Sequence, residues 1–79
     1  MTPEDYEQML VNQNGVCAIC GKPETATYHG KLMPLHIDHD HMVGEVRGLL
    51  CRRCNIKLGY LEDMEFVLKA RLYLVLHGN

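Results

Sequence analysis

Two pairs of cysteines with the same spacing carry the clearest chemical signal in this sequence. The pairs are Cys17 with Cys20 and Cys51 with Cys54, and each is a CxxC motif. Four thiolates from two such turns suit the tetrahedral coordination of Zn²⁺. A closed site of four cysteines leaves no open coordination position, so we expect this zinc to hold the fold rather than to catalyse a reaction. Two disulfides are the alternative use of the same cysteines.

A run of acidic residues and histidines, Asp38-His39-Asp40-His41, lies between the cysteine pairs. A carboxylate such as that of Asp38 suits a hard cation, Mg²⁺ or Mn²⁺. A neutral imidazole, as at His39, suits a general base working near neutral pH. Asn55 directly follows the last cysteine and offers a second hard oxygen, so Asp38 and Asn55 can share one cation if their elements pack together. The alternative is a surface run of turn residues without a functional metal.

The basic residues are concentrated in the middle of the chain. The net charge of −2 and the pI near 6.2 argue against a strongly basic nucleic-acid binder. Six of the eight lysines and arginines nevertheless lie between Cys17 and Lys57, against four acids. We expect Arg47, Arg52, Arg53 and Lys57 to contact a DNA backbone, with solvated surface positions as the alternative. Such binding should be modest and sensitive to salt.

The length of 79 residues predicts one domain, residues 1–79, near the size at which a hydrophobic core alone is marginal. The first residues are acidic, and no apolar run approaches the roughly 20 residues needed to cross a membrane. We therefore expect a cytoplasmic protein that does not contact membranes. In that reducing compartment, paired CxxC motifs indicate a metal rather than disulfides.

The first predicted element is a helix over residues 3–13. Thr2 is a favourable N-cap, Pro3 suits the first helical position, and Asp5 lies where a capping-box acid would. Asn14-Gly15 supplies the stop signal. The first CxxC turn follows this stop directly, in the manner of a zinc knuckle.

Short strands and two further helices are predicted after the knuckle. Residues 22–33 indicate a loop or a ragged hairpin, and the alternation of residues 35–38 predicts a strand that pairs with a second strand over 46–49. The second cysteine pair opens a helix that runs toward Gly59. Apolar residues keep helical spacing over 61–76, so we expect a last helix that covers the metal-bearing part or pairs with another copy.

Three runs in this order closely resemble the recombination endonuclease VII family. They are Cys-Ala-Ile-Cys-Gly, Leu-His-Ile-Asp-His-Asp-His and Gly-Glu-Val-Arg-Gly-Leu-Leu-Cys-Arg-Arg-Cys-Asn. The family belongs to the HNH, or ββα-metal (His-Me finger), nucleases, many of them encoded by phages. The resemblance covers residues 6 to 60 and implies an α+β fold: a small zinc-stapled ββα-metal domain with an N-terminal helix and a C-terminal helix.

The resemblance also implies a role for each matching residue. The metal-binding acid falls on Asp38, the general base on His39, and the metal-binding amide on Asn55. The second histidine, which serves the phosphate or the leaving group, falls on His41. The four cysteines match the structural zinc ligands, and the implied products carry a 5′-phosphate and a 3′-hydroxyl.

We therefore expect an HNH-type endodeoxyribonuclease that uses Mg²⁺ or Mn²⁺ and nicks DNA or cuts both strands. The main alternative is a non-catalytic zinc module that binds nucleic acid or protein, which would not need Asp38, His39 and Asn55 together. A third alternative is an activity that appears only within a larger phage or host DNA-processing assembly. The resolvase for which the family is named is longer and dimeric. Cutting both strands at a DNA junction requires two active sites, so this shorter chain would need to dimerise, for example through its last helix, to resolve junctions.

Overall fold

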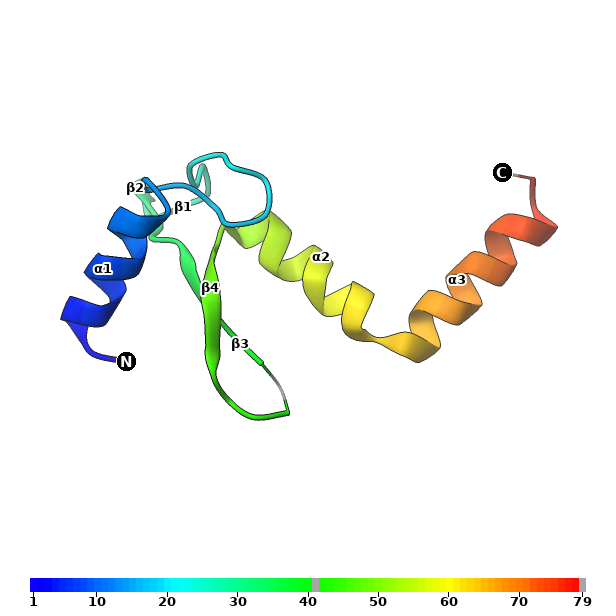
Figure 1. Ribbon diagram of the computed structural model, residues 1–79. Coiled ribbons are helices and arrows are strands. Elements are labelled where there is room, and N and C mark those ends of the chain that lie inside the picture. Colours follow the sequence, from blue (N-terminus) through cyan, green and yellow to red (C-terminus); the bar gives the residue numbers. More distant parts are fainter. Residues whose placement is uncertain (41, 79) are drawn as a thin grey trace.

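The computed structural model describes residues 1–40 and 42–78 of the chain. Within them, three helices and two small antiparallel sheets follow one another (Figure 1). The elements are α1 (Pro3–Asn12), β1 (Thr27–Tyr28), β2 (Lys31–Leu32), β3 (His36–His39), β4 (Val46–Leu50), α2 (Arg52–Glu62) and α3 (Met64–Leu76). The α+β class that the resemblance implied is confirmed, with β3, β4 and α2 as the ββα unit.

Helix α1 begins as its sequence predicts. The Thr2 hydroxyl accepts a hydrogen bond from the Asp5 N–H, and the Asp5 carboxylate accepts one from the Thr2 N–H, each at 3.1 Å. This reciprocal capping satisfies two of the N–H groups that a helix start leaves unpaired. At the other end, Asn14 and Gly15 adopt positive φ angles of 57° and 72°. The predicted helix over 3–13 is therefore confirmed to within one residue.

Strands β3 and β4 form the antiparallel hairpin at the centre of the molecule (Figure 1). Their pairing runs regularly from His36 opposite Leu50 to Asp38 opposite Gly48, and then shifts so that His39 lies opposite Val46. The shift leaves one extra residue on β4, which is a β-bulge. The two predicted strands are confirmed, each within one residue of its expected bounds.

The core is small and is shared between aliphatic side chains and cysteines. Leu49 on β4 is fully buried, and the remaining buried hydrophobic residues cluster around it. They are Cys17, Leu35, Leu50, Cys51 and Cys54. Because half of this cluster consists of cysteines, the fold depends on what those cysteines bind.

The segment between the knuckle and β3 contains a second, very short hairpin. β1 and β2 pair through Thr27 with Leu32 and through Tyr28 with Lys31. All four residues are exposed. The expectation of a loop or ragged hairpin over residues 22–33 is confirmed.

Helix α2 passes through Gly59 and ends at Glu62, so the expected end at Gly59 is wrong. A glycine inside a helix costs only about 1 kcal/mol. The helix is ended instead by Asp63. Its N–H donates to the Tyr60 carbonyl at 3.2 Å, and its carboxylate accepts from the Phe66 N–H at 3.1 Å. Asp63 is therefore both the C-cap of α2 and the N-cap of α3.

Helix α3 contacts α2 close to the turn that joins them and from there leads away from the rest of the fold (Figure 1). Its large apolar side chains are exposed: Met64, Phe66, Leu68, Leu72, Tyr73, Leu74, Val75 and Leu76. The radius of gyration is 15.5 Å, whereas a compact chain of this length has about 12 Å. The expectation that this helix covers the metal-bearing part is therefore wrong. The physical reason is that residues 72–76 are all apolar, so no single face of the helix is directed to the core.

Candidate metal centre and active site

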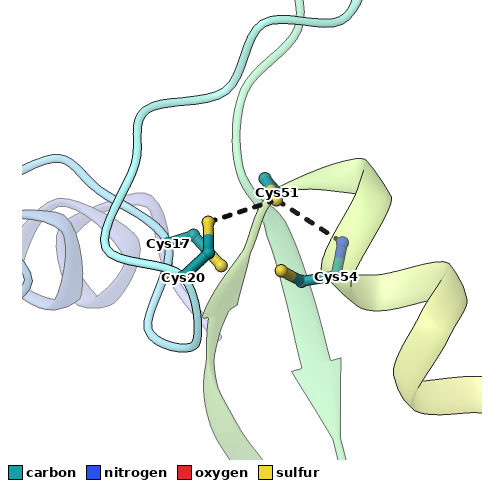
Figure 2. Close-up of side chains that lie close together, drawn as sticks. All are labelled: Cys17, Cys20, Cys51 and Cys54. Atoms are coloured by element: carbon teal, nitrogen blue, oxygen red, sulfur yellow. Dashed lines mark hydrogen bonds between the residues drawn. The ribbon is translucent and has the colours of Figure 1, made fainter.

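The four cysteines converge on one point, where the first knuckle meets the end of β4 and the first turn of α2 (Figure 2). Their sulfur atoms all lie within 4.8 Å of one another, and Cys20 Sγ is 3.9 Å from Cys51 Sγ. None of the four is in a disulfide. A tetrahedral zinc with bonds of about 2.3 Å separates its sulfur ligands by about 3.8 Å. The cluster therefore fits a structural zinc site, as the sequence predicted.

Backbone N–H groups are directed at the sulfur atoms in both CxxC turns. The Ile19 N–H donates to Cys17 Sγ at 3.4 Å, and the Cys54 N–H donates to Cys51 Sγ at 3.5 Å. Gly21 has a φ of 71° and closes the first turn, as expected for a knuckle. These donors stabilise negative charge on the sulfurs, which is the charge state that binds a metal.

The pKa values of two of the thiols, those of Cys17 and Cys54, are shifted in opposite directions. Burial disfavours the thiolate of Cys17, but hydrogen bonds from the backbone of Cys20, Cys51 and Ile19 outweigh it and lower the pKa to about 6. Burial, then hydrogen bonds with the other cysteines and the charge of Cys17, raise the pKa of Cys54 to about 12. Because four negative charges this close repel one another, the four thiols can all be ionised only when a cation binds them.

A buried carboxylate, that of Glu24, joins the loop after the first knuckle to the start of α2. Its Oε2 accepts a hydrogen bond from the Arg52 N–H at 2.6 Å, and its Oε1 accepts from the N–H groups of Thr25 and Ala26 at 3.0 Å. These bonds, that of Ala26 first, lower the pKa of Glu24. Sequence reasoning missed this residue, because an acid in a polar turn gives no local sign that it will cap a helix 28 residues away.

Asp38 and His39 lie next to each other at the end of β3 and face opposite ways. Asp38 is only 8% exposed, whereas His39 is exposed to solvent. This is the alternation that a strand imposes on consecutive residues. A carboxylate on the protein side and an imidazole on the solvent side are thus presented at one strand end.

Arg47 on β4 holds Asp38 in a bidentate ion pair. Its Nε lies 2.7 Å from Asp38 Oδ2, and its NH2 nitrogen lies 3.0 Å from Oδ1. The same guanidinium donates to both carboxylate oxygens of Glu62 at 3.2 Å. Hydrogen bonds to Asp38, and then to Glu62, raise the pKa of Arg47. Arg47 is thus an exposed strand residue whose guanidinium is paired with two carboxylates, and no local sequence pattern predicted this pairing.

The remaining predicted site residues lie on α2 or outside the described part. Asn55 is half-buried in the first turn of α2, where its N–H donates to the Cys51 carbonyl at 2.9 Å. Helix α2 packs against both β3 and β4, so Asn55 and Asp38 belong to elements in contact. Arg52, Arg53 and Lys57 are exposed along the same helix. His41 lies outside the described residues.

A β-hairpin followed by a helix, with four clustered cysteines that fit a structural zinc site, defines a small α+β protein. The chain belongs to the recombination endonuclease VII family, whose model matches residues 1–75. A gene 59 protein of Mycobacterium phage L5 is 42% identical over 77 residues, which cover 95% of this chain and 44% of the relative. A gene 59 protein of Mycobacterium phage D29 is 41% identical over 76 residues, covering 94% and 43%. The chain thus spans less than half the length of these relatives.

No helix in the described part of the chain combines the length and the apolar character that a membrane span requires.

Proposed function

We propose that this protein is a divalent-metal-dependent DNA endonuclease of the HNH type, which leaves 5′-phosphate and 3′-hydroxyl ends. The observation that carries the proposal is the exposed imidazole of His39 beside the buried carboxylate of Asp38 at the end of β3. Membership of the recombination endonuclease VII family supports the same activity.

In this proposal His39 is the general base. Its position on the solvent side lets it take a proton from a water molecule that attacks the phosphodiester. Asp38 and Asn55 would hold Mg²⁺ or Mn²⁺, because carboxylate and amide oxygens are the donors that such hard cations prefer. The cation, when bound, stabilises negative charge on the phosphate and on the leaving 3′ oxygen. His41 would assist at the phosphate or the leaving group.

The exposed basic residues of α2 would hold the DNA backbone. Arg53 and Lys57 are four residues apart and so share one face of the helix, with Arg52 beside them. Arg47 would add a further phosphate contact once it is released from Asp38. The zinc cluster would act only as a staple that fixes α2 against the hairpin.

We further propose that residues 1–79 act as one nuclease unit, phage-encoded or bacterial and working in the cytoplasm. The exposed apolar surface of α3 supports a homodimer formed through this helix, or docking onto a DNA-processing assembly. A dimer would supply the second active site that cutting both strands of DNA requires.

A plasmid-nicking assay with Mg²⁺ or Mn²⁺ tests the activity. The native chain should nick supercoiled plasmid, and His39→Ala should lower the rate by about 10²- to 10⁴-fold. His77→Ala is the matched control, because His77 is an exposed histidine that follows α3 and should leave the rate unchanged. Zinc content and circular dichroism must match among the three proteins.

Two results would argue against this proposal. Equal nicking by the native chain and His39→Ala would remove His39 from the role of base. No nicking by either protein, with both metals and at low salt, would favour the non-catalytic zinc module that binds nucleic acid or protein.

A further inference from the structure

The β-bulge in the central hairpin falls at Arg47. Asp38 pairs with Gly48 and His39 pairs with Val46, so Arg47 is the extra residue that has no partner position on β3. In a regular ladder, Arg47 and Gly48 would face opposite sides of the sheet. A bulge changes the direction of a side chain on the bulged strand. Here it accompanies the placement of the Arg47 guanidinium on the carboxylate of Asp38.

The guanidinium takes up both oxygens of that carboxylate. One contact is 2.7 Å and the other 3.0 Å, and the Asp38 side chain is only 10% exposed. A divalent cation binds carboxylate oxygens at about 2.0–2.2 Å, and its two charges repel a guanidinium at the same place. Arg47 and a divalent cation are therefore expected to compete for the Asp38 carboxylate.

Glu62 offers Arg47 a second partner at the other end of the same guanidinium. Both of its carboxylate oxygens lie 3.2 Å from Arg47 nitrogens, and Glu62 is the last residue of α2. An arginine that left Asp38 would still be paired with Glu62, so its release does not strand an uncompensated charge. The side chain of Arg47 is 34% exposed, which gives it room to move toward solvent.

We propose that Arg47 gates the metal-binding carboxylate: its guanidinium and the divalent cation compete for Asp38, with Glu62 keeping the displaced arginine beside the hairpin. The gate rests on the proposed function, because it assumes that Asp38 is a cation ligand. It adds a positioning role for two residues: Arg47, which contacts the proposed ligand Asp38, and Glu62, which contacts Arg47.

The test measures Mn²⁺ binding to the zinc-loaded chain by isothermal titration calorimetry, without DNA. Arg47→Ala should bind Mn²⁺ about tenfold more tightly than the native chain, because the competitor is gone. Arg47→Gln, which keeps the length but loses the charge, should act in the same direction. Arg71→Ala on α3 removes the same charge away from the hairpin and should change the affinity by less than about twofold.

A second variant tests the gate with Arg47 in place. Glu62→Gln should weaken Mn²⁺ binding several-fold, since the displaced arginine then lacks its charged partner. Glu65→Gln removes an equal charge three residues further along the chain, from a residue paired with Lys69, and should have a much smaller effect.

The outcomes separate the gate from the nuclease. Mn²⁺ binding that Asp38→Asn abolishes, but that neither Arg47 variant strengthens, would overturn the gate and leave the proposed cation site intact. Binding that survives Asp38→Asn in both the native and the Arg47→Ala background would overturn the gate together with the proposed cation site. Tighter binding by Arg47→Ala that Asp38→Asn reverses would establish the competition.

Discussion

The side-chain amide of Gln13 pairs with the backbone of Leu49 as a neighbouring strand would. Its Oε1 accepts the Leu49 N–H at 3.0 Å, and its Nε2 donates to the Leu49 carbonyl at 3.0 Å. Nε2 also donates to the Val16 carbonyl at 2.8 Å. One side chain thus fixes the end of α1, the knuckle and the most buried residue of β4 to one another.

Replacing Gln13 should therefore destabilise the whole protein. Gln13→Ala leaves the N–H of a fully buried Leu49 without its partner, and we expect a loss of about 1–3 kcal/mol in the free energy of unfolding. Gln8→Ala is the matched control, because Gln8 is exposed and bonds only to Asn12 within its own helix. It should change stability by about 0.5 kcal/mol or less. Urea denaturation of the zinc-loaded proteins measures both, and equal losses would contradict the structural role of Gln13.

Local sequence signals predicted the local structure well. The capping box of Thr2 and Asp5, the stop at Gly15 and the alternation before Asp38 each depend on residues that are close in the chain. The cysteine cluster could also be predicted, because two equal CxxC turns have few uses other than one metal.

The contacts that orient the site could not be predicted in this way. Arg47 meets Glu62 across 15 residues, and Gln13 meets Leu49 across 36, so no periodicity or short motif reports them. The position of the last helix was missed for a related reason. Apolar spacing marks it as a helix, but the consecutive apolar residues 72–76 do not show which face, if any, meets the core.

Glu24 should make the protein sensitive to acid. Hydrogen bonds in the folded state lower its pKa below the ordinary 4.5, so its stabilisation is complete above that value and is lost as the pH falls through the folded-state pKa. Glu24→Gln should cost about 1–2 kcal/mol at pH 7 and flatten the fall in stability below pH 4.5. Glu7→Gln, at an exposed position on α1, should do neither. Urea denaturation at a series of pH values measures the free energy of unfolding. The prediction is contradicted if Glu24→Gln loses stability below pH 4.5 as steeply as the native chain.

Zinc removal should unfold the hairpin and the start of α2. Half of the buried hydrophobic cluster consists of cysteines, so a chelator should lower the helical circular dichroism signal and abolish the cooperative thermal transition. Protons compete with zinc for the thiolates, so affinity should fall as the pH decreases. The fall should steepen below about pH 6, where Cys17 also takes up its proton. A chromogenic zinc indicator measures the release, and retention of zinc and fold at pH 5 would contradict the four-thiolate site.

The exposed surface of α3 should make the protein self-associate if the proposed dimer forms there. Leu68 and Leu72 are 63% and 59% exposed and four residues apart, so they lie on one face of the helix. Leu72→Glu should shift the sedimentation coefficient from that of a dimer to that of a monomer, because it places a charge in an apolar contact. Leu32→Glu, at a similarly exposed leucine of β2, should leave the coefficient unchanged. A native chain that sediments as a monomer at up to about 100 μM would contradict the dimer, because an obligate apolar interface binds far more tightly than this.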